Sequence, residues 1–210
     1  MLKFEKTVGA KPECESNEKI GSGNKRTALF LEAQAGNEVS LNLLVDLFYM
    51  DIYRMVYYRI GSDTDSQDIT QEIFITMAEK LKSIKEPDKF KSWLFKIALN
   101  KVNDFHRKKR FLSFISIDSD EMQNIELKDH QNPEKDFMKK DFYLKLKQFT
   151  DNLSKMEKQV FTLRFLDQLD IKEIGLVLKK NESTIKTHLY RAVSKFKNTH
   201  GLKDLLGGLR

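Results

Sequence analysis

Residues 90–110 read FKSWLFKIALNKVNDFHRKKR, a stretch that contains neither Gly nor Pro. At 100° per residue, this pattern predicts a long helix with a broad apolar face and a narrow polar stripe. The stripe consists of Lys96, Asn100, Asn103 and Arg107, and Trp93 lies at the border between the two faces. A helix of this kind could grip a nucleic acid strand, or it could be an ordinary amphipathic helix with a solvated face.

The composition of the 210-residue chain indicates an all-α fold. Apolar residues make up 40% and charged residues 32%, which is enough for packed cores in a soluble protein. Only 3 Pro and 9 Gly are present, and alternating β-branched runs are few. The N-terminus lacks the apolar core of a signal peptide, and no apolar run is long enough to span a bilayer. We therefore expect a cytoplasmic protein without membrane insertion.

Charge and cysteine content narrow the classes of function. The net charge of +6 favours a polyanionic partner such as nucleic acid. Cys14 is the only cysteine, so neither an internal disulfide nor a zinc site built on several cysteines can form, and we assign it no role. The sequence shows no metal-binding His pair, no phosphate-cradling glycine loop and no nucleophile motif. We expect no enzymatic activity, no metal and no cofactor.

The chain divides into two small helical domains joined by a flexible acidic linker. The linker carries seven acidic and two basic residues, a net charge of −5, and Pro133 interrupts any helix there. The predicted segments are a flexible leader at 1–25, a first domain at 26–110, the linker at 111–136, a second domain at 137–200 and a tail at 201–210.

Three helices are predicted ahead of residue 90. The first runs from about residue 26 to Gly36 and the second from about 38 to Gly61, each closed by its glycine. A third begins after the capping residues 62–66. Its buried face is expected to contain Ile69, Ile73, Phe74, Met77 and Leu81. Its opposite face carries Asp68, Gln71 and Glu72 around Ile75, and this face is either a protein-docking surface or a polar surface with a lone isoleucine. Asp88 is expected to cap the helix that bears Trp93.

The second domain ends in two short helices joined by a tight turn at residues 179–181. Two capping boxes, Ser154 with Glu157 and Asp170 with Glu173, mark the starts of helices. The last two helices have the pattern of a helix-turn-helix, although other helical hairpins look similar. The side chains expected to face DNA are Ser183, Thr184, Lys186, Thr187, His188, Arg191 and Lys195. The two threonines suit base edges and the basic groups suit phosphates, while His188 could be a plain surface histidine.

Three stretches in order resemble the signature regions of one bacterial family. They are DSQDITQEIF at 65–74, the stretch at 90–110, and LSKMEKQVFTLRFLDQLDIKEIGLVLKKNESTIKTHLYRAVSKF at 153–196. Together they resemble the extracytoplasmic-function sigma factors of the sigma-70 family, over roughly residues 26–108 and 140–197. Three such motifs in sequence are far more specific than any one of them.

The resemblance implies a role for each surface. The partners implied are core RNA polymerase, through the clamp helices of its β′ subunit and the flap of its β subunit, promoter DNA, and an anti-sigma factor. The residues matching the polymerase-binding region are Asp65, Asp68, Gln71, Glu72 and Phe74. They agree with the face around Ile75, except that the helical wheel puts Phe74 on the buried side. Those matching the part that melts and reads the −10 element are Trp93, Lys96, Asn100, Asn103 and Arg107. The final helix, from Ser183 to Lys195, matches the reader of the −35 element.

The chain departs from the family pattern at the helix-turn-helix. Lys179 and Lys180 stand where family members usually carry Gly and an apolar residue, which leaves the turn geometry open. Gly175 stands in place of a customary Ala and is expected to loosen its helix slightly.

Two other functions fit parts of the sequence. A helix-turn-helix regulator could bind duplex operator DNA as a dimer without polymerase, which would leave the motifs at 65–110 unexplained. A helical adaptor could bind protein alone, in which case the polar stripe would have no effect on transcription.

Overall fold

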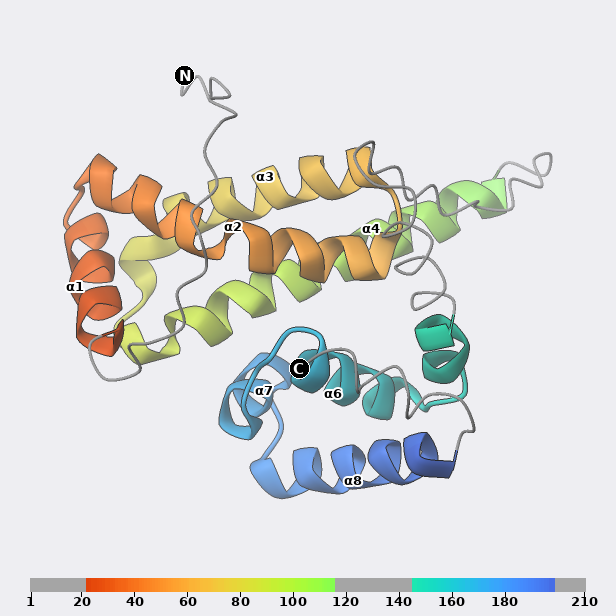
Figure 1. Cartoon of the computed structure of the whole chain (residues 1–210). Helices are drawn as coiled ribbons and strands as arrows, with labels where there is room; N and C mark the ends of the chain where they lie inside the picture. The colour runs from red at the N-terminus through yellow and green to blue at the C-terminus, as the bar shows by residue number, and fades with distance from the viewer. Residues whose placement is uncertain (1–21, 116–144, 199–210) are drawn as a thin grey trace, which may run out of the picture.

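The computed structural model describes residues 22–115 and 145–198, and the regular structure in these ranges is helical, as predicted. The first domain contains α1 (Ser22–Gln34), α2 (Glu38–Ile60), α3 (Asp63–Lys80) and α4 (Phe90–Ile115), with single 3-10 turns at Leu81–Ser83 and Pro87–Lys89. The second contains a helical segment at 145–151, then α6 (Lys155–Phe165), α7 (Ile171–Leu178) and α8 (Glu182–Asn198). Figure 1 shows α2, α3 and α4 as a bundle with α1 across one end.

Local sequence signals account for most helix ends. The Asn37 side chain accepts a hydrogen bond from the Ser40 amide at 3.1 Å and starts α2. Gly61, at φ +80°, ends α2 in the left-handed region that glycine tolerates. Both capping boxes of the second domain are present, at Ser154 with Glu157 and at Asp170 with Glu173.

Three predicted boundaries differ from the structure. Helix α1 begins at Ser22, so residues 22–25 belong to a helix and not to the leader. Asp88 does not cap α4, because it lies inside the 3-10 turn at Pro87–Lys89, which has no side-chain cap and leads directly into Phe90. Helix α4 continues to Ile115, past the predicted start of the linker at residue 111. The leader at 1–21 with Cys14, the rest of the acidic linker and the tail from 199 lie outside the described residues.

The first domain is held by an apolar core between α2, α3 and α4. Ile73 and Met77 of α3 and Leu94 of α4 are fully buried. The predicted buried face of this helix is confirmed, since its five members are at most 9% exposed, although Leu81 belongs to the 3-10 turn that follows α3. Phe90 joins α1 to this core, with its ring 5.3 Å from Phe30 and 5.4 Å from Phe48. The start of α4 is thereby fixed against two other helices.

The second domain has a smaller aromatic core. Phe149, Phe161 and Phe196 pack with ring centroids 5.1–5.8 Å apart and tie residues 145–151, α6 and α8 together. One ion pair supports this core: Lys195 of α8, which is 49% exposed, contacts the buried Glu157 of α6 at 2.7 Å, and the Glu157 side chain is only 7% exposed.

The turn of the helix-turn-helix is formed without glycine. Lys179 adopts φ +53°, in the left-handed region, and ends α7. The Asn181 side chain accepts a hydrogen bond from the Thr184 amide at 2.8 Å and starts α8. A Cβ atom on Gly175 would lie 2.8 Å from the carbonyl oxygen of Lys180. The expectation that Gly175 merely loosens its helix is therefore wrong, because this glycine makes room for the turn.

Within the residues described, none of the helices is both long enough and apolar enough to cross a membrane.

The ion pair in the second domain predicts an acid-sensitive stability. The hydrogen bond from Lys195, followed by that from the Ser154 amide, lowers the pKa of the Glu157 carboxyl from 4.5 to about 2. The ionised carboxylate therefore stabilises the fold fully above about pH 4.5, and this contribution is lost as the pH falls toward 2. We expect Glu157→Gln to lower the free energy of unfolding near neutral pH by about 1–3 kcal/mol and to flatten its dependence on pH in that window.

Urea unfolding of both proteins at several pH values measures this effect. Asp151→Asn is the matched control, because Asp151 pairs with Lys158 at 2.7 Å but is 55% exposed, so it should cost much less. Parallel pH profiles for wild type and Glu157→Gln would contradict the assignment.

Candidate nucleic-acid interface

The polar stripe of α4 lies on the surface, as predicted, but its members differ in accessibility. Asn100, Asn103 and Arg107 are exposed, and Lys96 is half-buried. Arg107 makes an ion pair with Asp104 at 3.0 Å, yet its side chain stays 76% exposed and can reach a phosphate. The stripe therefore offers two amides and one accessible cation along one line, with a second cation at its covered end.

Trp93 is half-buried at the edge of the stripe. Its ring centroid lies 6.1 Å from that of Phe90 at an interplanar angle of 34°. Trp93 thus packs against the core through one side and borders the cavity beside Lys96 with the rest.

The acidic face of α3 forms a second exposed surface. Asp68, Gln71, Glu72 and Ile75 are exposed, and Asp65 is half-buried at the start of the helix. Ile75 keeps 54% of its surface open to solvent, and Glu72 contacts Lys101 of α4 at 2.8 Å. Phe74 is 5% exposed and stacks on Tyr49 at 6.0 Å, so it supports this face from inside. An open apolar side chain among carboxylates and amides suits a protein partner better than a nucleic acid.

Helix α8 presents most of the predicted side chains to solvent. Ile185, Ala192 and Phe196 are buried, as expected for the core side of a recognition helix. Ser183, Lys186, Thr187 and Arg191 are exposed, whereas Thr184 and His188 are half-buried. Lys195 is exposed too, and its ammonium group is paired with Glu157 of α6 at 2.7 Å. A phosphate would have to compete with that carboxylate for Lys195.

Sequence reasoning missed two residues on the same face. Tyr190 is 78% exposed and Ser194 is also exposed. With Ser183 and Thr187 they have spacings of four, three and four, so the four residues form the centre of the solvent face of α8. That spacing can be read from the sequence alone.

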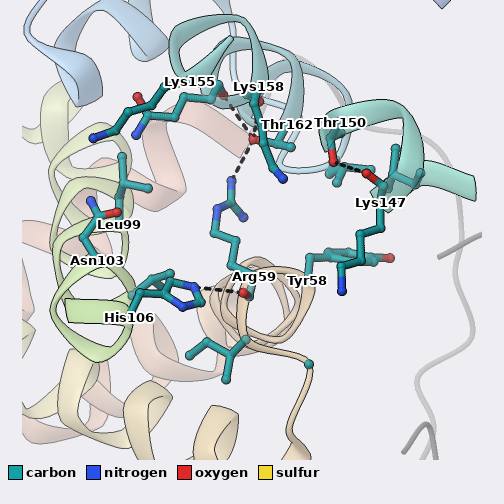
Figure 2. A pocket seen from close by; sticks show the side chains of 16 residues that line it. Tyr58, Arg59, Leu99, Asn103, His106, Lys147, Thr150, Lys155, Lys158 and Thr162 are labelled. Atoms are coloured by element: carbon teal, nitrogen blue, oxygen red, sulfur yellow. Dashed lines mark hydrogen bonds between the residues drawn. The ribbon is translucent and has the colours of Figure 1, made fainter. Parts of the chain in front are cut away.

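A basic cleft lies between the two domains (Figure 2). Its volume is about 460 Å³, and its lining includes Lys147, Lys155, Lys158 and His106, with no acidic residue among the described side chains that line it. The His106 ring contacts the carbonyl oxygen of Arg59 at 3.0 Å, and burial lowers its pKa below the usual value. The charge of this cleft therefore comes mainly from its lysines, because Arg59 is paired with the Asp167 carboxylate.

Comparison with known proteins places these surfaces in a family context. The family description "Sigma-70 region 2" matches residues 44–111, and "Sigma-70, region 4" matches residues 143–196. Together the two matches span more than half of the chain. The first holds α3 and the stripe of α4, and the second holds the helix-turn-helix.

Curated relatives agree with these matches. The ECF RNA polymerase sigma factor BldN of Streptomyces coelicolor is 31% identical over 77% of this chain and 60% of its own length. RNA polymerase sigma factor SigV of Bacillus subtilis is 29% identical over 68% of this chain and 80% of its own length. The solved structure of CnrH in complex with the cytosolic domain of CnrY has a TM-score of 0.60 at 19% identity, covering 87% of this chain and 97% of that one. This last likeness shows the fold alone.

The exposed face of α8 predicts how salt affects duplex binding. We expect Arg191→Ala to weaken binding of the full chain to duplex DNA and to reduce the slope of log K against log[salt] by about 1, because one phosphate contact is lost. Fluorescence anisotropy at several salt concentrations measures both values. Arg191→Lys keeps the charge and should keep the slope; an unchanged slope in Arg191→Ala would show that Arg191 does not contact phosphate.

Proposed function

The chain belongs to the extracytoplasmic-function group of the sigma-70 family. From this membership we propose which surface of the chain takes part in each step of transcription initiation. It is a promoter-specificity subunit, which binds core RNA polymerase and directs initiation by recognising and melting the −10 element and reading the −35 element. It acts in the cytoplasm with polymerase and catalyses no reaction of its own.

One observation carries this proposal. A single chain carries an exposed face of acidic, amide and apolar side chains on α3, an amide and cation stripe on α4, and an exposed face of short polar and basic side chains on α8, in the order of the two family regions. A polymerase-independent regulator would use α8 and leave the first two surfaces without a ligand. A protein adaptor would use α3 alone.

The α3 face is assigned to the clamp helices of the β′ subunit. Its exposed apolar centre is Ile75, and the acidic and amide side chains around it are Asp65, Asp68, Gln71 and Glu72. Burial of an exposed isoleucine on binding contributes favourably in proportion to the apolar area removed from water. The carboxylates around it set the orientation, because a cationic partner surface meets them and an acidic one is rejected.

The α4 stripe is assigned to the separated non-template strand of the −10 element. Taking a base out of the duplex stack costs a few kcal/mol, so melting requires a surface that binds the extruded base and its backbone. Asn100 and Asn103 can donate to and accept from base edges, and Arg107 can hold a phosphate. Stacking on an aromatic ring contributes about 1–3 kcal/mol per base. Trp93, which lines a cavity together with Lys96 at the edge of the stripe, is the ring assigned to this contact.

The α8 face is assigned to duplex DNA at the −35 element. Ser183 and Thr187 are short enough to approach base edges in the major groove, and Lys186 and Arg191 flank them as phosphate ligands. Thr184, His188 and Lys195 complete the proposed contact set, with Lys195 requiring release from Glu157. An anti-sigma factor is proposed as a regulatory partner on the strength of the family alone.

Transcription from core polymerase tests the whole assignment. Core enzyme mixed with the chain should yield specific run-off transcripts from genomic DNA of the source organism, and core enzyme alone should not. Binding to duplex DNA without any effect on transcripts would favour the operator-binding regulator, and binding to core without transcripts would favour the adaptor.

The docking face yields a specific variant. We expect Ile75→Arg to weaken binding to core polymerase about ten-fold or more without lowering stability, because Ile75 is 54% exposed and leaves no cavity. Val39→Arg is the matched control, since Val39 is also an exposed apolar residue, 68% open, on a surface with no assigned ligand. Sedimentation or surface plasmon resonance against core enzyme measures the difference. Equal affinities for the two variants would remove α3 from the polymerase interface.

The α4 stripe yields a second variant that tests the proposal. Asn100→Ala should slow open-complex formation much more than it weakens core binding, because its amide meets DNA only after the strands separate. A fluorescent base within the −10 element reports the opening rate, and the core titration above reports binding. Equal losses in both would contradict a role confined to the melted strand.

A further inference from the structure

Apart from Asn103, the residues that line the basic cleft belong to none of the three surfaces assigned above. Helices α2 and α4 form one wall of the cleft, and residues 145–151 with α6 form the other (Figure 2). Its volume of about 460 Å³ falls in the range of about 300–1,000 Å³ that small-molecule sites occupy, and such sites often lie between domains. The cleft is therefore large enough for a small ligand, and no step assigned above uses it.

Lysines of the second domain gather at the solvent side of the cleft. Lys147 and Lys155 line it and are exposed, and neither forms an ion pair within residues 22–115 and 145–198. Lys158 also lines it and is paired with Asp151 at 2.7 Å. A neighbouring hollow shares Lys155 with the cleft and adds three cations of the first domain: Arg107, Lys109 and Arg110. Positive charge from both domains therefore converges on one place.

His106 lies where these charges meet. Burial lowers the pKa of its imidazole below the usual value, although the hydrogen bond to the Arg59 carbonyl opposes this shift. The charges of Arg110, Lys109 and Lys158 lower the pKa further. An imidazole whose protonation is disfavoured by three neighbouring cations marks a region of positive potential, and such a region stabilises a bound anion.

The deeper wall of the cleft is apolar. Leu99 and Val102 of α4 and Leu146 of the facing segment are buried. The half-buried ring of Tyr58 lines the cleft as well, on the side where Figure 2 shows Lys147. An aromatic ring together with aliphatic side chains is suited to a flat apolar group. The cleft thus combines a wall for a ring system with a cationic side for an anion.

We propose that this cleft binds a nucleoside polyphosphate. Its base lies against Tyr58 and the apolar wall, and its phosphates lie at Lys147, Lys155 and the basic end of α4. Lysine suits this role because its ammonium group is a compact charge with three donors on a flexible stem, which adapts to a chain of phosphates. This inference goes beyond the promoter assignment and does not rest on it.

The shape of the cleft favours a small ligand over a nucleic acid strand. A strand carries one negative charge per nucleotide and binds along grooves that follow its backbone. The lysines here surround one space, and a polyphosphate concentrates several charges on neighbouring atoms. Each contact between an ammonium group and a phosphate oxygen is a charge-assisted hydrogen bond, which is stronger than a neutral one.

Isothermal titration calorimetry of the full chain, without polymerase or DNA, tests the proposal. We expect ATP, GTP or both to bind with a dissociation constant below about 1 mM, tripolyphosphate to bind more weakly, and adenosine and guanosine to show no binding at the same concentrations. Absence of binding by both nucleotides would overturn the proposal, and so would tripolyphosphate that binds as tightly as they do. A pentathymidylate that displaces the nucleotide and binds more tightly would assign the cleft to a nucleic acid strand instead.

Two double variants of equal charge locate the site. Lys147→Gln combined with Lys155→Gln should weaken nucleotide binding about ten-fold or more, because two charge-assisted contacts are lost. Lys80→Gln combined with Lys172→Gln is the matched control, since it removes the same charge from two exposed lysines outside the cleft. The control should change the affinity by less than about two-fold, because distant surface charges are screened by salt. Equal losses in the two double variants would show non-specific attraction and would overturn the site.

Gln159→Glu tests the site without removing a lysine. Gln159 is half-buried and lines the cleft, so this nearly isosteric change places a carboxylate in the wall beside the phosphates. We expect the affinity for the nucleotide to fall about ten-fold or more through like-charge repulsion. Gln148→Glu, at an exposed position outside the cleft in the same domain, is the control and should keep the affinity. Unchanged binding in Gln159→Glu would overturn the proposal and, because polymerase takes no part, would leave the sigma-factor assignment as it stands.

Discussion

The burial of α4 is the constraint on which the rest of the structure depends. Its apolar face packs against α2 and α3, its first residue anchors α1, and α7 covers part of the side that remains. A helix enclosed this widely leaves only a narrow strip for a ligand, and the exposed part of that strip is Asn100, Asn103 and Arg107. The packing that fixes the helix therefore also fixes where a nucleic acid strand can bind.

Two ion pairs, each with a buried carboxylate, join different parts of the structure. Lys195 and Glu157 belong to one domain, and their contact holds a recognition helix on its support. Arg59 and Asp167 belong to different domains, and both charges lose hydration where they meet. The first pair supports the fold of the second domain. The second pair joins the two domains.

Local features were predictable from the sequence and long-range ones were not. The capping boxes and the buried face of α3 depend on residues three or four positions apart, so periodicity found them. Asp88 was misassigned because a 3-10 turn formed where a simple cap was expected. The partner of Lys195 lies 38 residues away, and that of Arg59 lies 108 residues away, so a helical wheel could place these side chains on a face but could not name what they meet. Gly175 was misread for a different reason, because its close neighbour, the carbonyl oxygen of Lys180, is only five residues away but is brought near by the left-handed conformation of Lys179, which the sequence does not reveal.

The central claim is that this chain, with polymerase, opens promoter DNA and holds the separated strand on α4. Permanganate oxidation of unpaired thymines on a promoter fragment tests it most directly. The account predicts reactive thymines in the non-template strand at the −10 element when chain and core polymerase are both present, and none with either alone. Thymines that stay unreactive under all three conditions, or that react equally with core polymerase alone, would contradict it.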